Sequence, residues 1–322
     1  MSRNKRKNTL TVAFYNVENL FDTIDNPLTM DNDFTPKGKK KWNKNRYRHK
    51  IKKISSILPL LGAQESKYAP AIIGLVEVEN AKVLKDLIRH KNLINHNYSY
   101  IHYNSPDERG IDVAMLYKND LFTVLSSKTH PLHLSGTDGN HDYTRDLLVV
   151  KGVLNGDLVH VLVNHWPSRR DGEDKTQHKR IKAAKLVHEV IEEIKSEEKV
   201  ESKFIIMGDF NDDPSSESVK KHLVTNEFYN PMYTMHKKNN GTSTFYNEWH
   251  LFDQIIISNN FDNDESSLIF SKAKIFKKPW MRIYKGKFKG SPFRTYIGPW
   301  YEGGFSDHFP VYLTFNKKSL RK

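Results

Sequence analysis

The chain has 322 residues, of which 37% are apolar, and this is enough to build a sizeable hydrophobic core. It carries 51 Lys and Arg against 38 Asp and Glu, so its formal net charge is +13. Such a balance favours polyanionic partners, such as nucleic acid or anionic lipid headgroups, and argues against an acidic small-metabolite enzyme. The absence of cysteine excludes disulfides, thiolate zinc sites and cysteine nucleophiles, so oxygen or imidazole groups must hold any metal.

The two ends of the chain are basic and predict short tails around one domain. We expect an N-terminal tail at residues 1–8, a single domain at residues 9–316 and a C-terminal tail at residues 317–322. Polar residues interrupt the start before an apolar signal segment is complete, and no apolar run approaches the roughly 20 residues that cross a bilayer. We therefore expect no stable membrane insertion and a cytoplasmic location; the alternative is a secreted protein whose leader has been removed. A monomer is expected.

Short apolar runs rich in β-branched residues predict buried strands along the whole chain. They lie at residues 10–15, 72–76, 113–117, 147–154, 159–163, 204–207, 254–258 and 311–315. Apolar residues at helical spacing predict amphipathic helices around residues 51–58, 83–88 and 183–194. The dipeptide Asn155-Gly156 between two of the strands predicts a hairpin turn. This mixture indicates an α/β fold with largely antiparallel sheets.

Two stretches are strongly basic and contain aromatic residues. Residues 37–53 hold ten Lys or Arg, and residues 272–294 hold nine, with no acidic residue in either stretch. Cations contact the phosphates of a nucleic acid while aromatic rings stack on its bases, so both stretches are candidate nucleic-acid surfaces. The alternative is a solvated basic face whose lysine stems cover apolar surface.

Acidic and amide side chains gather where predicted strands end, which is where sheet scaffolds present functional groups. Asn16 and Glu18 follow the first strand, and Glu77 ends the second apolar run. Carboxylate and amide oxygens suit a hard cation such as Mg²⁺ or Mn²⁺. Asn16 could instead cap a turn, whereas a carboxylate at the edge of the core, such as that of Glu77, needs a partner.

Three later segments carry groups suited to phosphate chemistry. His165 precedes a hydroxyl and two guanidinium groups, which can bind and polarise a phosphoryl oxygen, although a lone histidine is more often structural. Asp209 and Asn211 are two residues apart after a strand, so extended backbone places both on one side, where they can address one water and one phosphate. His308 follows Asp307 directly before the last strand, and a carboxylate behind an imidazole favours its protonated form.

In this order, the segments resemble the endonuclease/exonuclease/phosphatase superfamily. The resemblance runs from about residue 9 to residue 315 and is carried by Asn16-Val17-Glu18, Glu77, Asn164-His165, Gly208-Asp209-Phe210-Asn211, Asp253 and Ser306-Asp307-His308-Phe309-Pro310. It implies a deoxyribonuclease I-like, four-layer α/β sandwich, in which two mixed, mostly antiparallel sheets pack face to face with helices on the outer faces. The opening from Asn16 to Asp22 is similar to that of bacterial members described as secreted nucleases.

The resemblance implies a metal site and a catalytic set. Glu77 would be the main ligand of Mg²⁺ or Mn²⁺, and nearby acidic or amide groups would be Asn16, Glu18 and Asp307. In the catalytic set, Asp209 would activate or orient the attacking water and Asn211 would position the water or the phosphate. Two imidazoles would donate to phosphate oxygens, namely His308 backed by Asp253 and His165 backed by Asp112, with Glu108 as the second choice of partner for His165.

Further residues are expected to bind substrate. Arg145 resembles a phosphate-contacting arginine of the nuclease branch, and the other candidates are Asn164, Ser168, Arg169, Arg109 and Arg180. The long basic-aromatic insertion before Ser306 and the loop from Pro27 to Lys44 match no substrate-defining motif, so they leave the specificity open.

The activity that we expect is divalent-metal-dependent hydrolysis of phosphodiesters by in-line attack of water. The leading hypothesis is an endonuclease that acts on DNA, with RNA as a further substrate, because both basic stretches suit a polyanion. The alternative is a phosphoesterase that acts on a phosphoinositide, a sphingolipid or another small phosphate ester, whose basic surface would attract an anionic membrane. A catalytically silent nucleic-acid-binding module would require the loss of a core site residue, and none is missing.

Overall fold

The structure is a computed structural model that describes residue 6 and residues 8–136, 139–198, 200–238, 240–245, 248–263 and 266–318. Most of the expected N-terminal tail and residues 319–322 of the C-terminal tail lie outside the described residues. No helix within the described ranges is long and apolar enough to span a membrane.

Sheet 1 has six strands, and only β1 and β2 in it run parallel to each other. In spatial order its strands are β15 (Leu268–Ile275), β18 (Val311–Lys317), β1 (Thr9–Leu20), β2 (Ile72–Val78), β4 (Asp112–Lys118) and β3 (Tyr98–His102). The first and last strands of the chain therefore pair in the middle of one sheet, which brings the two ends of the described chain together.

Sheet 2 also has six strands, and its one parallel pair is β9 with β10. In spatial order its strands are β11 (Phe228–Tyr229), β14 (Asp253–Ser258), β10 (Lys203–Asp209), β9 (Asp157–His165), β8 (Leu147–Leu154) and β5 (Phe122–His130). The hairpin predicted at Asn155-Gly156 is confirmed, because β8 and β9 pair antiparallel across it.

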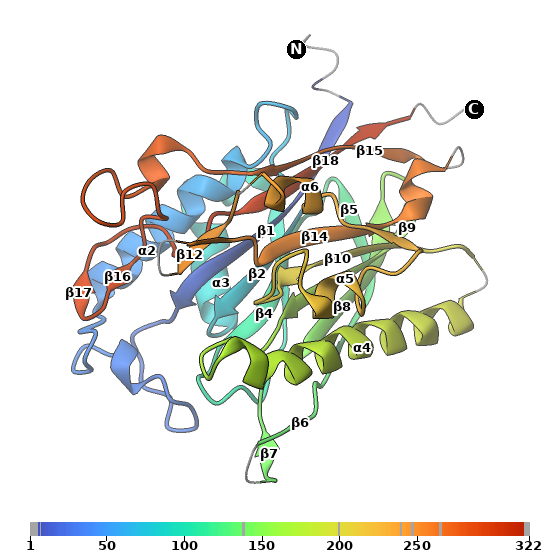
Figure 1. Cartoon of the computed structure of the whole chain (residues 1–322). Helices are drawn as coiled ribbons and strands as arrows, with labels where there is room; N and C mark the ends of the chain where they lie inside the picture. The colour runs from blue at the N-terminus through green and yellow to red at the C-terminus, as the bar shows by residue number, and fades with distance from the viewer. Residues whose placement is uncertain are drawn as a thin grey trace.

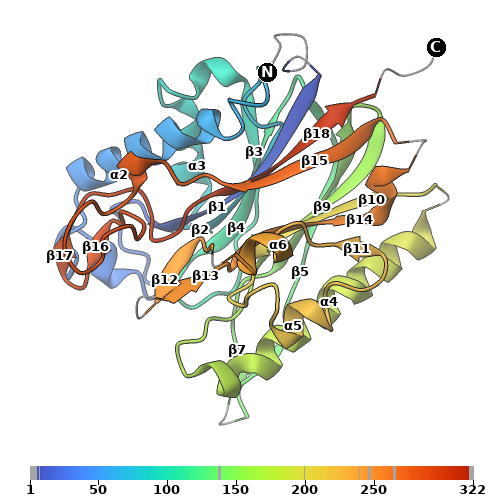
Figure 2. The same ribbon diagram turned by 45° about the horizontal axis from the view of Figure 1, so that its top comes forward.

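The two sheets pack face to face, and helices cover their outer faces (Figures 1 and 2). Two helices, α2 (Lys44–Ile57) and α3 (Ala81–Arg89), pack on sheet 1, and the long α4 (Glu173–Glu197) packs on sheet 2. This arrangement confirms the predicted four-layer α/β sandwich with mixed, mostly antiparallel sheets.

Strict alternation along β1 divides its side chains between two cores. Leu10, Val12 and Phe14 point into the core between the sheets, whereas Ala13 and Tyr15 point into the core beneath α2 and α3. Because successive side chains of a strand lie on opposite faces, a strand buried on both faces needs a continuous apolar run. This explains why β1, β2, β9 and β10 were visible in the sequence.

Short elements complete the fold and lie mainly in the connections. The small strands are β6 (Leu134–Ser135), β7 (His141–Asp142), β12 (Ser243–Phe245), β13 (Glu248–His250), β16 (Tyr296–Ile297) and β17 (Trp300–Tyr301). The short helices are α5 (Glu217–Lys220), α6 (Tyr233–His236) and the 3₁₀ turns Asn32–Phe34, Leu58–Leu60, Ile94–His96, Asn259–Asp262 and Pro279–Met281. The β12–β13 hairpin and the segment from β15 to β18 border the site described next.

Candidate active site

The polar residues singled out in the sequence meet at one end of the two sheets. Some of these residues lie at the carboxyl ends of β1, β2, β9 and β10. The others lie at or just before the amino ends of the antiparallel partners β14 and β18. In the register of sheet 2, for example, Asp209 pairs with both His165 and Asp253. Gly208 is required here, because a Cβ at this position would come within 2.5 Å of the Asn164 carbonyl oxygen.

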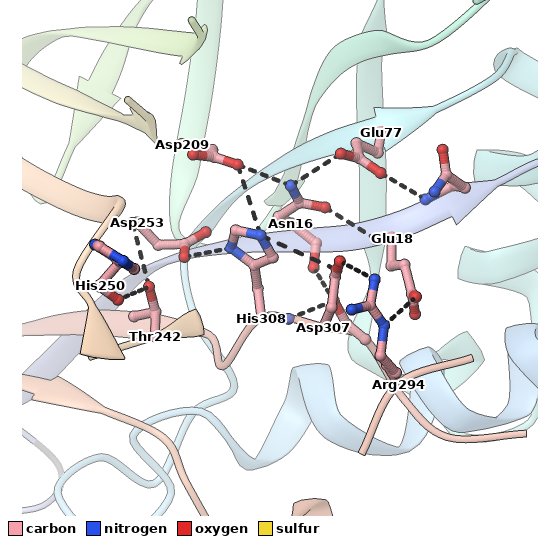
Figure 3. A network of polar contacts seen from close by, with 12 residues as sticks. Asn16, Glu18, Glu77, Asp209, Thr242, His250, Asp253, Arg294, Asp307 and His308 are labelled. Atoms are coloured by element: carbon pink, nitrogen blue, oxygen red, sulfur yellow. Dashed lines mark hydrogen bonds and ion pairs between the residues drawn. The ribbon is translucent and has the colours of Figure 1, made fainter. Parts of the chain in front are cut away.

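A single amide connects the acidic groups of the two sheets. The Asn16 side-chain nitrogen donates to Glu77 Oε1 at 3.2 Å and to Asp209 Oδ2 at 2.9 Å (Figure 3). The amide orientation is set by its oxygen, which accepts from the backbone N–H of Glu18 at 2.9 Å. Asn16 therefore presents its nitrogen to the two carboxylates and its oxygen to the backbone, and its role as a metal ligand stays a prediction.

We call the place where Asn16 meets Glu77 and Asp209 the junction. Strained backbone conformations are concentrated around it. Glu18, Asn19, Glu77 and Asn211 have positive φ angles of 51°, 50°, 63° and 49°. The ladder between β1 and β2 shifts register at this place, and a bulge of this kind re-aims side chains. Glu77 is held in its turned position by the backbone N–H of Asn19, which donates to Glu77 Oε2 at 2.8 Å. Non-glycine residues with such φ values cost free energy, and they cluster at functional sites in proteins.

His308 stands between two carboxylates. Its Nδ1 shares a 2.6 Å hydrogen bond with Asp253 Oδ2, and its Nε2 lies 3.9 Å from Asp209 Oδ2. Burial alone would lower the pKa of His308, but the charges of Asp253 and Asp209 outweigh burial and hold this pKa well above its usual range. Burial and the nearby Asp253 raise the pKa of Asp209, while the cationic imidazole opposes that rise. The arrangement provides an imidazolium donor beside a buried carboxylate.

His165 approaches the same carboxylates from the other side but in a different protonation state. Its Nε2 lies 3.9 Å from Glu77 Oε1 and 3.9 Å from Asp209 Oδ2. Burial and the positive charges of Arg145, Arg109 and His308 hold its pKa well below the usual range. The neutral form of His165 is therefore favoured, and this imidazole can still donate a hydrogen bond from its protonated ring nitrogen.

Glu18 and Asp307 face a basic cluster rather than the junction. Glu18 accepts from the backbone N–H of Thr295 at 2.7 Å and lies 3.5 Å from Lys50 Nζ, and Arg294 bridges Glu18 at 3.4 Å to Asp307 at 2.7 Å. Two cations and an N–H engage the Glu18 carboxylate, and its role near the metal stays a prediction. Asp307 is half-buried and keeps its other oxygen 4.0 Å from His308 Nε2.

The pairing of His165 with Asp112 is also corrected. Asp112 Oδ2 shares a 2.9 Å hydrogen bond with His102, and its Oδ1 accepts from the backbone and hydroxyl of Ser105. Within the described residues, His165 Nδ1 is a buried nitrogen without a hydrogen-bond partner. Asp112 therefore orients the neighbouring edge strand and does not support His165.

Three arginines expected to bind phosphate are instead internal supports. Arg145 is buried and donates to Asp107 at 3.0 Å and to the Trp166 carbonyl at 2.8 Å. Arg180 is completely buried and lies 2.7 Å from Asp212. Arg169 donates to Asp212 at 2.6 Å and to the Asn211 carbonyl at 2.7 Å. Arg145 thus braces the segment after β9, and Arg169 and Arg180 brace the loop after β10.

The remaining substrate candidates divide into internal and accessible groups. The buried Asn164 side chain accepts from the Trp166 indole at 3.1 Å and is therefore structural. Asn211 donates one amide hydrogen to the Trp166 carbonyl at 2.9 Å, which leaves its second amide hydrogen. Ser168 is exposed and Arg109 is 37% exposed, so both stay candidates for substrate contact.

Lys50 and Arg294 are the neighbours of the site that the sequence interpretation did not assign. Lys50 is buried beneath Glu18, where it donates to the Thr295 hydroxyl at 2.6 Å and to the Phe305 carbonyl at 2.7 Å. Burial lowers the pKa of Lys50 against the raising effect of Glu18. Both residues belong to the basic stretches, in which no sequence signal distinguishes a site residue from a solvated lysine or arginine.

The donor chemistry at the junction fits a hard divalent cation. Glu77 is only partly buried and shares the Asn16 amide with Asp209, and carboxylate oxygens are the ligands that Mg²⁺ prefers. Ligand atoms of Asp209, Asp253 and His308 also lie within 4.8 Å of one another. Asp253 is completely buried, however, and its oxygen is engaged with His308, so we interpret this second group as a proton-handling set.

Several solved structures share the fold of this chain. A humanized TDP2 of D. rerio with 14 mutations is 15% identical, with a TM-score of 0.60 and coverage of 97% of this chain and 100% of that chain. An endonuclease/exonuclease/phosphatase family protein of Bacteroides thetaiotaomicron is 18% identical, with a TM-score of 0.59 and coverage of 97% and 99%. A mannosyl-6-phosphatase of Bacteroides thetaiotaomicron is 16% identical, with a TM-score of 0.57 and coverage of 95% and 99%.

These solved structures share too little sequence with the chain to assign its family, but a family model does assign it. No curated protein matched the chain. The profile described as Endonuclease/Exonuclease/phosphatase family matches residues 11–317, which is nearly the whole chain. The chain therefore belongs to the endonuclease/exonuclease/phosphatase family.

Proposed function

We propose that the chain is a divalent-metal-dependent nuclease that hydrolyses phosphodiesters of DNA, with RNA as a further substrate. The observation that carries the proposal is the placement of Asp209. One of its oxygens lies 3.9 Å from His308 Nε2, 3.9 Å from His165 Nε2 and 2.9 Å from the Asn16 amide. A carboxylate flanked by a cationic and a neutral imidazole can orient a water while the imidazoles bind the phosphate under attack.

The roles of the protein groups follow from their protonation states. Asp209 would accept a hydrogen bond from the attacking water and remove a proton from it as the new P–O bond forms. His308, which is cationic, would donate from Nε2 to a phosphate oxygen, and Asp253 would hold its ring in place through Nδ1. His165 is neutral and would contact a second phosphate oxygen as a hydrogen-bond donor. These donors act on the negative charge that grows as water attacks.

Glu77 would be the main protein ligand of Mg²⁺ or Mn²⁺, and Asn16 would set the distance between Glu77 and Asp209. A bound divalent ion would supply Lewis-acid neutralisation of the phosphate charge. The amide of Asn16 also separates two acidic groups that repel each other before a cation is bound.

The charge of the chain and the position of its basic segments support a polyanionic substrate. The first basic stretch packs on the second and on the residues that follow it. Lys53 lies 5.8 Å from the ring of Phe293 and 4.3 Å from that of Phe305, and Arg46 lies 4.4 Å from that of Tyr301. Exposed lysines on one such surface raise the local concentration of nucleic acid and add affinity that depends on salt. Among the related folds, D. rerio TDP2 has been crystallised with a single-strand DNA product.

A second candidate is a phosphatase that acts on a small phosphate ester. The specific observation in its favour is the mannosyl-6-phosphatase of Bacteroides thetaiotaomicron among the structures with this fold. The same carboxylates and imidazoles would serve that reaction, so the substrate has to be decided by assay. A sugar phosphate would not need the extended basic surface, which favours the nuclease.

Cleavage of supercoiled plasmid by purified protein tests the proposal. Nicking should require Mg²⁺ or Mn²⁺, stop in EDTA and fall by about 10²-fold to 10³-fold in Asp209→Asn, because this change removes the base and leaves the shape intact. Glu217→Gln, at a half-exposed position of the short helix α5, is the matched control and should cleave at the wild-type rate. If folded wild-type protein hydrolyses mannose 6-phosphate but neither DNA nor RNA, the phosphatase replaces the nuclease.

A further inference from the structure

The outer side of sheet 1 carries a groove between α2 and α3 that contains none of the site residues described so far. Two hydrogen bonds hold the two helices side by side in the same direction. The Tyr47 hydroxyl donates to Asp86 Oδ2 at 2.6 Å, and the Ser55 hydroxyl shares a 2.8 Å hydrogen bond with His90 Nδ1. We call the hollow between them the α2–α3 groove.

Cations dominate both walls of the α2–α3 groove. All six are exposed, with Lys44, Arg48 and Lys52 on α2 and Lys82, Arg89 and Lys91 on α3 or just after it. Among the described residues that line the groove, Asp86 is the single acid, and Lys82 already pairs with it at 3.1 Å. Within the same described ranges, the other five cations form no ion pair. An anion from outside the chain therefore meets an uncompensated positive potential here.

The charges of the two walls act on the same space. Burial lowers the pKa of His90, and the charges of Lys91 and Lys52 lower it further. Lys91 follows α3 whereas Lys52 lies on α2, so the imidazole of His90 senses both walls. A bound anion would likewise be attracted from two sides, which a flat basic surface does not provide.

The spacing of the α2 cations suits a chain of phosphates. Lys44, Arg48 and Lys52 are four residues apart, so they form one row with about 6 Å between successive positions. Successive phosphates of an extended nucleic-acid strand repeat at a similar interval, and a positively charged groove can follow the backbone of a single strand. The largely buried ring of Tyr47 and the exposed Ile24 add apolar contact for sugars and bases.

The α2–α3 groove begins at the end of sheet 1 that carries the site. Thr23 and Ile24 line it and follow β1, which supplies Asn16 and Glu18 to the site. α3 begins directly after β2, which supplies Glu77, and α2 runs in the same direction as α3. A strand whose reacting phosphate lies at the site therefore reaches the groove with nucleotides further along the strand.

We propose that the α2–α3 groove binds the sugar-phosphate backbone of a single-stranded segment of the substrate, several nucleotides from the phosphate that is cleaved. The inference rests on the proposed nuclease function and deepens it, because it assigns long single strands as the preferred substrates. The first basic stretch supplies one wall, and α3, which carries no site motif, supplies the other. The groove contributes salt-dependent affinity and no catalytic group.

Binding in EDTA tests the groove independently of cleavage. The measurement is the slope of the logarithm of affinity against the logarithm of salt concentration, for a labelled twenty-nucleotide thymidine strand. Combining Arg48→Gln with Lys52→Gln should reduce this slope by about 1.4, because each phosphate contact on a single strand contributes about 0.7. Combining Arg89→Gln with Lys91→Gln should give a similar reduction from the other wall.

The matched control combines Lys182→Gln with Lys185→Gln, which removes the same charge from exposed positions of α4 on sheet 2. Its slope should equal that of the wild type, because α4 covers the other sheet. If both groove variants behave like this control, the groove is overturned while the nuclease stands.

Competition decides between a nucleic acid and an acidic protein segment as the occupant. A glutamate peptide with as many charges as the strand should displace the labelled strand at least about tenfold less well than an unlabelled strand does, because it carries no bases to stack. Equal displacement by the peptide, abolished in both groove variants, would assign the groove to an acidic peptide and overturn the proposal.

Cleavage separates failure of the groove from failure of the proposed function. With metal present, the combined Arg48→Gln and Lys52→Gln variant should raise the KM for the twenty-nucleotide strand about tenfold and leave kcat unchanged. The KM for a trinucleotide should not change, because a trinucleotide bound at the site does not reach the groove. An equal rise in KM for both substrates would overturn the groove. Reduced slopes in both groove variants, without cleavage under any metal, would overturn the nuclease and keep the groove.

Discussion

The Asn16 side chain has a role that only the structure identifies. Its amide nitrogen lies between Glu77 and Asp209, so it fixes the spacing of two carboxylates from different sheets. Groups that orient a metal ligand without touching the metal still govern metal affinity, often by about 10-fold to 100-fold.

Asn16→Ala should therefore weaken activation by Mg²⁺ about 10-fold to 100-fold, because Glu77 loses the donor that orients it. The measurement is the Mg²⁺ concentration that gives half-maximal activity. Asn45→Ala, at an exposed position in the first turn of α2, is the control. An unchanged Mg²⁺ requirement in Asn16→Ala would show that Glu77 is oriented by other groups.

The protonation state of His308 predicts how kcat changes at alkaline pH. Because Asp253 and Asp209 raise its folded pKa above the usual value, the cationic form is favoured below the raised pKa and lost as pH rises through it. We expect kcat at saturating Mg²⁺ to fall as pH rises through that raised value. Asp253→Asn should move this fall to lower pH, and His308→Gln should reduce kcat by about 10²-fold to 10³-fold.

The test is a pH profile of kcat for the wild type and Asp253→Asn. The same charge interaction contributes to folding, so the stability contributed by His308 is fully present below the ordinary imidazole pKa and declines as pH rises through the raised one. Coincident alkaline limbs in the two proteins would contradict the assignment of His308 as the cationic donor.

Residue type and chain order predicted which polar groups gather at the site, but not how they pair. His308 with Asp253 was expected and is present at 2.6 Å, whereas Asp112 pairs with His102 and Arg145 with Asp107. The difference has a physical reason. A strand end places a residue at the sheet edge, but the orientation of its side chain depends on bulges and cross-strand register, which one sequence does not reveal.

At the scale of elements, one buried lysine of α2 connects this helix to the site through hydrogen bonds. Lys50 reaches from α2 to Glu18 on β1 and to Thr295 and the Phe305 carbonyl before β18. Arg294 also pairs with Glu18, so loss of the lysine mainly leaves buried hydrogen-bond acceptors without a donor, which costs about 1–3 kcal/mol.

Lys50→Met should lower the free energy of unfolding by about 1–3 kcal/mol, because the Thr295 hydroxyl and the Phe305 carbonyl lose their buried donor while Arg294 still pairs with Glu18. Urea unfolding at pH 7 measures the change. Lys52→Met, exposed on the same helix, is the matched control and should stay within about 0.5 kcal/mol of the wild type. A loss in Lys50→Met no larger than that of the control would mean that Glu18 keeps its charge without help from α2.

The elements that sequence patterns missed are mainly the edge strands. β5 and β15 close opposite sheets at their edges, and many of their side chains are exposed or half-exposed. A strand that buries few side chains carries a weak apolar signal, while the central strands, covered on both faces, carry a strong one. The predicted helices at α2, α3 and α4 were found because each buries one apolar face.

At the scale of the whole molecule, the net charge of +13 predicts binding that depends steeply on salt. The logarithm of the affinity for duplex DNA should fall linearly with the logarithm of the salt concentration. Each lysine that contacts a phosphate adds about 0.9 to the slope.

Replacing the lysine pair Lys285 and Lys287 with alanine should therefore reduce the slope by about 0.9 for each that contacts a phosphate, with similar losses for all sequences. Lys220→Ala and Lys221→Ala near α5 are matched controls at exposed positions. Binding titrations between low and physiological salt measure the slope. If replacing Lys285 and Lys287 leaves the salt dependence of the affinity unchanged, the insertion that contains them does not contact the nucleic acid.

In the proposed reaction, water oriented by Asp209 cleaves a nucleic-acid phosphodiester with the help of a divalent cation. The most direct measurement is cleavage of a single-stranded oligonucleotide in ¹⁸O-labelled water, with mass spectrometry of the products. One ¹⁸O should appear on the new terminal phosphate, the reaction should depend on Mg²⁺ or Mn²⁺, and the labelled product should be lost in Asp209→Asn. Unlabelled product phosphate, or full labelling by Asp209→Asn at the wild-type rate, would contradict this mechanism.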